Sequence, residues 1–180
     1  GEMMNAEYEN VLDDHLGQIH FTYVNTWDEL LPAHWHEHLE IIYVLGGEIT
    51  ASINDVSYEL KKGDIFLVNS NDIHYTYTHE DARYYLLQIP PVHLERISAK
   101  WKGLKFQELI RSKSADACVQ GEQLENVQGK GLVEMRENRK STNRADDLYD
   151  QLRDVFRKIA GFYEEKKEGY HLLVLSAVYR

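Results

Sequence analysis

One stretch decides the fold: Pro32-Ala-His-Trp-His-Glu-His-Leu-Glu-Ile-Ile-Tyr-Val-Leu-Gly-Gly47. Three histidines fall within five residues and lead directly into an apolar, β-branched run. In a β-strand, successive side chains alternate between two faces, so the three histidines share one side with Glu40. A helix would turn the middle histidine away, and the proline and the β-branched residues both disfavour a helix. The stretch therefore predicts a strand that aims several imidazoles and one carboxylate into an enclosed space.

A second stretch, Gly63-Asp-Ile-Phe-Leu-Val-Asn-Ser-Asn-Asp-Ile-His74, predicts a turn, a short buried strand, a polar turn and one more histidine. Together the two stretches resemble the paired motifs of the cupin superfamily. The first motif is His-x-His, three residues, Glu, six residues and Gly, and it is met by His34, His36, Glu40 and Gly47. The second is Gly, five residues, Pro-x-Gly, two residues and His, and its two ends are met by Gly63 and His74. The resemblance implies a double-stranded β-helix, or jelly-roll barrel.

A few motif positions depart from the family pattern. They are Asp28 where the first motif opens with Gly, Asn69 for Pro, Asn71 for Gly, and Thr78 where Asn is frequent. These positions shape turns rather than bind ligands, and asparagine tolerates a left-handed backbone better than most residues. The barrel fold is therefore still expected. The direction of the His74 side chain follows less directly from the motif than it would with the usual Pro and Gly.

Short strands are predicted at regular intervals on both sides of these motifs. Their ranges are 19–24, 36–45, 48–53, 56–60, 65–69, 73–78 and 83–89, with 27–31 as a connection. Asn54-Asp55 indicates a two-residue hairpin because both residues accept positive φ. Such a pattern is typical of an antiparallel sandwich or barrel rather than a βαβ fold. Pro90-Pro91 ends it, so we expect the barrel to span residues 1–95.

Residues 96–143 are expected to form an irregular connecting section. A short helix is predicted over 94–104, a helix or a returning strand over 106–110, and a loop over 112–131, which is rich in Ser, Gly, Gln and Asn. The fold class predicted for the whole chain is mainly β with C-terminal α.

Residues 144–180 are expected to form a pair of helices for dimerisation and linkage. An apolar stripe at steps of four and three predicts an amphipathic helix over 144–167, and it comprises Leu148, Leu152, Val155, Ile159 and Phe162. Asn143 is a plausible N-cap, and Gly169 is a stop signal. Residues 170–180 begin a second apolar helix with no terminating signal. We therefore expect the chain to be cut from a longer protein, ahead of a C-terminal DNA-binding region.

Composition excludes several classes of protein. The 180 residues carry a formal net charge of −10, which disfavours nucleic-acid binding because phosphate contacts need clustered Lys and Arg. The single cysteine, Cys118, cannot form an internal disulfide and fits a reducing cytosol. No signal peptide and no apolar run of about 20 residues is present, so a soluble cytoplasmic protein without membrane contact is predicted.

The order of these parts resembles the N-terminal sensing and dimerisation region of AraC-type transcription regulators. Two segments are close to the sequences usual in that family: His34-Trp-His-Glu-His-Leu-Glu-Ile-Ile-Tyr-Val-Leu and Leu60-Lys-Lys-Gly-Asp-Ile-Phe-Leu-Val-Asn. The resemblance implies a barrel that holds a small effector, helices that pair two subunits, and DNA binding by a helix-turn-helix region that these residues do not include.

The candidate ligand-binding residues are His34, His36, Glu40, His74, Tyr85 and Gln88. Two roles remain open for the first four. Three imidazoles and a carboxylate suit a divalent metal such as Zn, Ni, Mn or Fe, whereas regulator-type cupins often use the same groups as polar lining of an effector pocket. His38 is expected to face solvent. Trp35 and Tyr43 have the opposite parity and are expected to pack.

Two functions compete. The first is a non-enzymatic effector-sensing and dimerisation domain, with a sugar, a sugar acid or an aromatic acid as effector and a homodimer formed through residues 144–180. The second is a metal-dependent cupin enzyme of the dioxygenase or sugar isomerase type, which uses the same barrel. The uncapped C-terminal helix favours the first. A zinc protease is excluded, because His36-Glu37 would need a second histidine where Glu40 stands.

Overall fold

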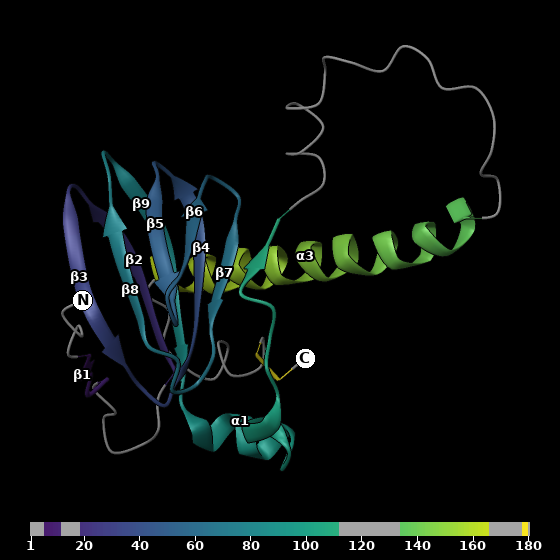
Figure 1. Ribbon diagram of the computed structural model, residues 1–180, viewed down its shortest axis with the longest axis horizontal. Coiled ribbons are helices and arrows are strands. Elements are labelled where there is room, and N and C mark those ends of the chain that lie inside the picture. Colours follow the sequence, from purple (N-terminus) through teal and green to yellow (C-terminus); the bar gives the residue numbers. More distant parts are fainter. Residues whose placement is uncertain (1–5, 12–18, 112–133, 166–177, 180) are drawn as a thin grey trace.

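The described residues of the computed structural model, 6–11, 19–111, 134–165 and 178–179, form two facing five-stranded β-sheets beside a long helix (Figure 1). One sheet has the strand order β1-β3-β8-β5-β6, and the other has the order β10-β7-β4-β9-β2. The strands are β1 (Glu7–Tyr8), β2 (His20–Thr26), β3 (Glu29–Trp35), β4 (Leu39–Gly46), β5 (Ile49–Ile53), β6 (Val56–Leu60), β7 (Ile65–Val68), β8 (His74–Thr78), β9 (Ala82–Ile89) and β10 (Leu109–Ile110). The predicted mainly β jelly roll with C-terminal α is confirmed.

Side chains of β4 alternate between two hydrophobic clusters. Ile42 and Val44 lie between the two sheets, where they join a buried cluster with Phe66 of β7. Leu39 and Ile41 belong to a second cluster, which contains the buried residues of the long helix. Both clusters are apolar because each face of this sheet is covered, one by the opposite sheet and one by the helix.

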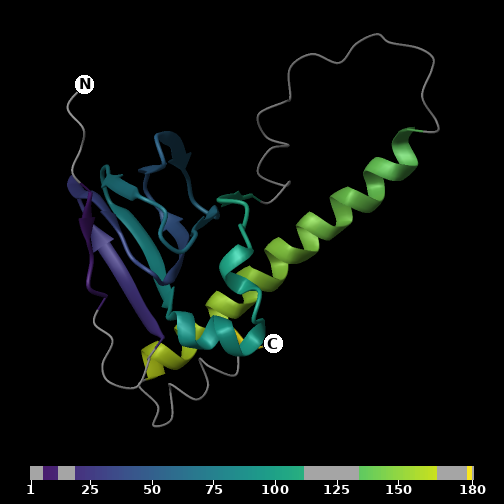
Figure 2. The same ribbon diagram turned by 60° about the horizontal axis from the view of Figure 1, so that its bottom comes forward.

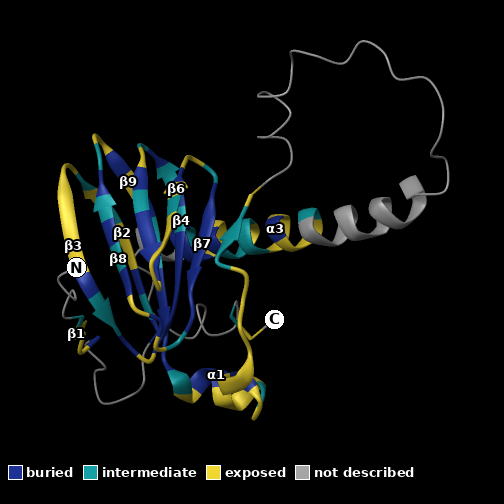
Figure 3. Ribbon diagram, viewed as in Figure 1, coloured by how far each residue is buried: buried dark blue, intermediate teal, exposed yellow. Residues whose placement is uncertain are grey.

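Two predicted strand boundaries were wrong. Residues 27–31 were expected to be a connection, but β3 begins at Glu29 and continues to Trp35. The next strand was expected from residue 36, but β4 begins at Leu39. The chain leaves one sheet after β3 and enters the other at β4, so residues 36–38 cross between the sheets. The exposed first half of β3 gives no alternating apolar pattern, as the yellow part of its ribbon shows (Figure 3).

Left-handed backbone occurs at the turn positions that the cupin motifs mark. The motif glycines Gly47 and Gly63 have φ values of +71° and +92°. Asp28 and Asn71, which replace glycine in the motifs, have φ values of +49° and +65°. Asparagine and aspartate therefore supply the conformation that glycine usually supplies. The predicted hairpin at residues 54–55 also forms, with both residues at positive φ between β5 and β6.

A short helical layer follows the double proline. Helix α1 (Pro91–Ile97) has a proline in its first turn, where the missing N–H is not needed, and the 3₁₀ helix η1 (Trp101–Gly103) comes next. Together they replace the single helix predicted over 94–104. Of the two alternatives for 106–110, the strand is correct, because β10 pairs with β7. The loop predicted over 112–131 lies outside the described residues.

Helix α3 (Glu134–Glu165) crosses the outer face of the sheet that contains β4 and projects well beyond it (Figures 1 and 2). It begins before residue 144, so the predicted N-cap at Asn143 was wrong. The buried face of the helix is also rotated from the predicted stripe. Leu148 is 48% exposed, whereas its neighbour Tyr149 is buried.

The buried face of α3 lies against the barrel of its own chain. Phe156 and Ile159 are fully buried, and the Phe156 ring lies 5.5 Å from the Tyr43 ring and 6.4 Å from the Phe21 ring. The Tyr149 hydroxyl donates a 2.6 Å hydrogen bond to the carbonyl of Gly63. The 3-4 apolar spacing therefore serves packing on a sheet rather than the helix–helix packing we expected. The predicted second helix, 170–180, lies outside the described residues except for residues 178–179.

Within the described ranges, no helix is both long and apolar enough to cross a membrane.

Candidate ligand and metal site

A polar cluster lies where the two sheets meet, and both sheets contribute to it. His34 of β3 and His74 of β8 are direct cross-strand partners in one sheet. Glu40 of β4 and Gln88 of β9 are direct cross-strand partners in the other. His36 comes from the crossing segment between them. Five of the six candidate ligand-binding residues are thus brought together.

The three imidazoles of this cluster converge closely. One nitrogen from each of His34, His36 and His74 lies within 4.8 Å of the others. The His34 and His74 ring centroids are 4.1 Å apart, and those of His36 and His74 are 4.9 Å apart. His36, His74 and Glu40 are buried, and His34 is half-buried. Such a dense group of ionisable side chains inside a β-sandwich is costly unless its members are paired or bind a ligand.

Backbone carbonyls orient all three rings in the same way. The Nδ1–H of His34 donates to Pro32 O at 2.7 Å, that of His36 to His38 O at 3.1 Å, and that of His74 to Asp72 O at 3.0 Å. This pattern places the protonated Nδ1 on the backbone side and turns each Nε2 toward the common centre. Metal-binding histidines are commonly oriented by such a hydrogen bond from the other ring nitrogen.

His36 and Glu40 form a buried ion pair. The Nε2–H of His36 donates to Glu40 Oε2 at 3.0 Å, and Gln88 Nε2 donates to the same oxygen at 3.0 Å. Both ring nitrogens of His36 thus donate, which requires an imidazolium. Burial lowers the pKa of His36, but the hydrogen bond to Glu40 and the charges of Glu40 and Glu9 outweigh burial and raise it. Burial likewise raises the pKa of Glu40, but the hydrogen bond from His36 and the nearby imidazoles lower it overall.

His74 has the opposite character. Burial lowers its pKa below the ordinary value, although the Glu40 charge opposes this shift. Its Nδ1–H is bonded to the backbone, and its buried Nε2 has no hydrogen-bond partner among the described residues. A neutral imidazole therefore directs a free lone pair at the cluster centre. A hydroxyl donor or a cation would satisfy that lone pair.

The residues of the cluster fit a divalent cation, which the cupin resemblance implies. The imidazoles of His34, His36 and His74, with the Glu40 carboxylate, would hold it once His36 had released its Nε2 proton to solvent, and these nitrogen and oxygen donors suit Zn, Ni, Mn or Fe. A bound cation would supply a Lewis-acid attachment point for an oxygen of the ligand.

Two residues do not lie where the sequence placed them. Tyr85 of β9, a candidate ligand-binding residue, lies on the opposite face of its strand from Gln88's cluster and stacks on Phe21 at 5.2 Å under α3. His38, expected to face solvent, is 6% exposed, and its ring lies near His20 and His36. It is buried because it belongs to the segment that crosses between the sheets. Tyr43 packs against α3 as expected, and Trp35 packs on Tyr8.

One residue of the cluster was missed. Glu9 lies in the N-terminal segment, and its Oε2 is 3.7 Å from His34 Nε2 and 3.9 Å from His36 Nε2. The polar, weakly periodic residues around it gave no strand signal, and the two-residue strand β1 is too short to produce one.

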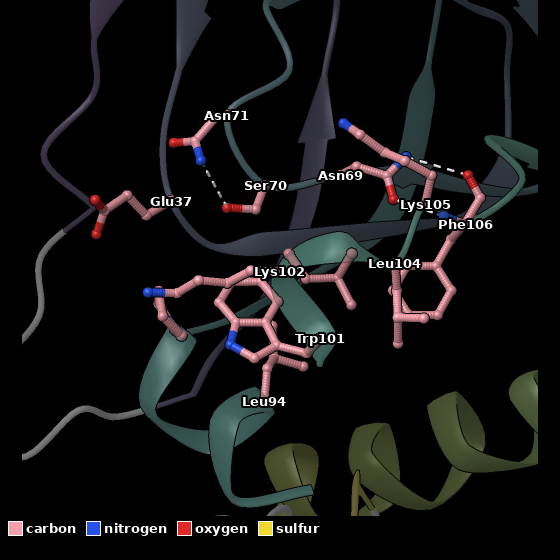
Figure 4. Close-up of a pocket in the computed structure, with 12 residues that line it drawn as sticks. Glu37, Asn69, Ser70, Asn71, Leu94, Trp101, Lys102, Leu104, Lys105 and Phe106 are labelled. Carbon is pink, nitrogen blue, oxygen red and sulfur yellow. Dashed lines mark hydrogen bonds between the residues drawn. The ribbon is translucent and has the colours of Figure 1, made fainter. Parts of the chain in front are cut away.

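A separate pocket of about 220 Å³ lies outside the sandwich, between the β7–β8 loop and the α1–η1 layer (Figure 4). Its apolar walls include Trp101 and Leu94. Most of its polar side chains already have partners within the protein: Asn69 with the backbone of Phe106, Asn71 with Ser70, Lys102 with Glu95, and Lys105 with Asp72. Trp101 Nε1 is buried without a hydrogen-bond partner among the described residues, but the other groups named here are satisfied, so the pocket is a weaker candidate for a polar ligand than the histidine cluster.

The His36–Glu40 pair predicts a pH-dependent contribution to stability in protein stripped of cations. The pKa of His36 is raised in the folded state, so its protonation stabilises the fold. This stabilisation is complete below the unfolded-state pKa of 6.5 and is lost as the pH rises through the folded-state pKa. The pKa of Glu40 is lowered in the folded state, so its ionisation also stabilises the fold. This stabilisation is present above the unfolded-state pKa of 4.5 and is lost as the pH falls through the folded-state pKa. Glu40→Gln should therefore cost most between pH 4.5 and 6.5, by about 2 kcal/mol, in urea unfolding.

Glu59→Gln is the matched control, because Glu59 is exposed and bonds only Thr50 among the side-chain contacts of the described residues. Its effect should be small at every pH. A loss from Glu40→Gln that is equal at pH 5.5 and pH 9 would contradict the ion pair.

The strand order and the cluster define a cupin-type jelly roll with a polar site between its sheets. More specifically, this chain belongs to the AraC-like ligand binding domain family, whose family model matches residues 17–180. No curated protein sequence matches it significantly.

Solved structures with similar folds are distant. An RmlC-like cupin from Shewanella frigidimarina is 20% identical, with a TM-score of 0.39 over 41% of this chain and 68% of that chain. KdgF from Halomonas sp. is 22% identical, with a TM-score of 0.39 over 43% and 73%. A predicted oxalate decarboxylase from Thermotoga maritima is 23% identical, with a TM-score of 0.37 over 39% and 64%.

Proposed function

We propose that this chain is the effector-sensing domain of an AraC-type transcriptional regulator of the cytoplasm. Membership in the AraC-like ligand binding domain family supports this proposal, and the buried cluster at the junction of the sheets is the observation that carries it. In the proposal, DNA is bound by a helix-turn-helix region outside these 180 residues. The acidic net charge of −10 argues against DNA contact by this part.

The chemistry of the cluster favours a hydroxyl-bearing effector such as a sugar or a sugar acid. Glu40 accepts hydrogen bonds, and the free lone pair of His74 needs a donor. Sugar hydroxyls donate to both groups. An aromatic acid without hydroxyls would bring its carboxylate toward Glu40, and the like charges would repel each other unless a cation lay between them.

A homodimer formed through residues 144–180 belongs to this proposal. The face of α3 that contains Phe156 is occupied by the barrel, so pairing would use the other face, where Leu148 is exposed. Helix α3 also projects beyond the sheets (Figure 2).

A metal-dependent cupin enzyme is the second candidate. The inward convergence of the three Nε2 atoms favours it, since such a donor set can hold a catalytic cation as well as an effector. The two candidates differ in what happens to the small molecule. A sensor releases it unchanged, whereas an enzyme converts it.

A thermal-shift screen of sugars and sugar acids tests the proposal. An effector at 100 times its dissociation constant should stabilise the domain by about 2.7 kcal/mol. Gln88→Leu removes the donor to Glu40 and should abolish the shift. Lys102→Glu, at the rim of the outer pocket, should leave the shift unchanged.

The reverse pattern, with the shift lost in Lys102→Glu and kept in Gln88→Leu, would place the effector in the outer pocket and overturn the proposed site. Mass spectrometry of the small molecule after incubation separates the two functions. Recovery of a chemically altered product would overturn the sensor proposal in favour of the enzyme.

A further inference from the structure

Glu9 brings a second carboxylate to the histidine cluster from a distant part of the sequence. Its Oε2 lies 3.7 Å from His34 Nε2 and 3.9 Å from His36 Nε2. The other carboxylate, Glu40, lies 3.0 Å from His36 Nε2 and 3.9 Å from His74 Nε2. The three imidazoles are therefore flanked by two carboxylates, one of them buried and the other 45% exposed.

The backbone fixes the position of Glu9. Strand β1 runs parallel to β3, with Glu7 opposite His34 and Tyr8 opposite Trp35. The N–H of Glu9 donates to Trp35 O at 2.9 Å, and the Tyr8 and Trp35 rings lie 4.8 Å apart. These contacts hold the Cα of Glu9 beside the cluster independently of its side chain. The Glu9 carboxylate is thus kept within reach of the cluster before any ligand binds.

The separations between the carboxylate oxygens and the imidazole nitrogens match those around a single metal ion. Donors about 2.1 Å from one ion lie roughly 3.0 Å apart when they are at right angles and roughly 4.2 Å apart when they are opposite. The distances from Glu9 to the two imidazoles, 3.7 and 3.9 Å, fall within this interval, as do the distances of 3.0 and 3.9 Å from Glu40.

We propose that Glu9 is a ligand of a divalent cation at this cluster, and that it completes a set of three imidazoles and two carboxylates. Two carboxylates neutralise the charge of the dication, which lowers the cost of holding it between the sheets. Five protein donors exceed the four of a closed zinc site, so the set suits five- or six-coordinate Mn, Fe or Ni. The inference rests on the proposed site, but its test needs no effector.

The test uses the purified chain without a histidine tag, stripped of metal and titrated calorimetrically with Ni²⁺. The unmodified chain should bind one equivalent, and Glu9→Gln should weaken binding at least tenfold. Glu7→Gln is the matched control, because Glu7 is an exposed acid on the same short strand. It should bind as tightly as the unmodified chain. Urea unfolding of metal-free Glu9→Gln checks that the variant folds.

Co²⁺ separates direct ligation from a longer-range effect of charge, because its visible spectrum reports coordination number and geometry. Glu9→Gln should change this spectrum at saturating Co²⁺, and Glu7→Gln should not. Equal Ni²⁺ affinity in Glu9→Gln and the unmodified chain would overturn the inference. An unchanged Co²⁺ spectrum would do the same. Absence of Ni²⁺ and Co²⁺ binding by the unmodified chain would overturn it too, while leaving the effector proposal standing.

Discussion

Replacing Phe156 with alanine is expected to lower the free energy of unfolding by about 3–5 kcal/mol. The side chain is 1% exposed and lies against the rings of Tyr43 and Phe21. Its removal would leave a cavity between α3 and the sheet that rigid strands cannot fill. Urea unfolding followed by circular dichroism measures the effect.

Leu148→Ala is the control for this prediction. Leu148 lies two turns earlier on the same helix and belonged to the stripe predicted from the sequence, but it is 48% exposed. Its replacement should cost less than about 1 kcal/mol. A larger loss from Leu148→Ala than from Phe156→Ala would mean that the helix presents its other face to the barrel.

Gly47→Ala is expected to be nearly as destabilising, at about 3 kcal/mol or more. The glycine has φ of +71°, and a Cβ atom there would lie 2.5 Å from the carbonyl oxygen of Asp81 and 2.7 Å from the Cα of Ala82. Both obstacles are backbone atoms, so no side-chain rotation can relieve the clash. Thermal or urea unfolding would report the loss.

Gly63→Ala separates backbone strain from the steric clash. Gly63 also has positive φ, at +92°, but among the described residues a Cβ atom there would meet only the Tyr149 hydroxyl oxygen, at 3.4 Å. The expected cost is therefore that of the left-handed conformation alone, about 1–2 kcal/mol. Equal losses in the two variants would show that the close approach at Gly47 is relieved by movement of the β8–β9 turn.

The barrel was predictable because its strands follow local rules. Alternation in β4, the residues at 54–55 and the glycines at 47 and 63 each specify one conformation from nearby residues alone. The spacing of the motifs predicted that one cluster would contain His34, His36, Glu40 and His74, because the same pattern sets the register of the strands.

The failures have a common physical origin in contacts between distant segments. The position of Tyr85 depends on which face of β9 is covered by α3, and β9 has apolar residues on both faces. The burial of His38 depends on the path of residues 36–38 between the sheets, which has no local signature. Glu9 reaches the cluster through β1, whose pairing with β3 involves two residues. Each of these placements is a tertiary outcome that periodicity does not encode.

The location of the polar cluster where the two sheets meet has a mechanical consequence. A molecule that bonds His74 and Glu40 together ties one layer of the sandwich to the other, since each residue belongs to a different sheet. Sliding of the layers would break those bonds, so occupancy resists shear. A molecule bound there would hold the two layers in register, and its release would leave the crossing segment and the His36–Glu40 ion pair among the contacts that join them at this end.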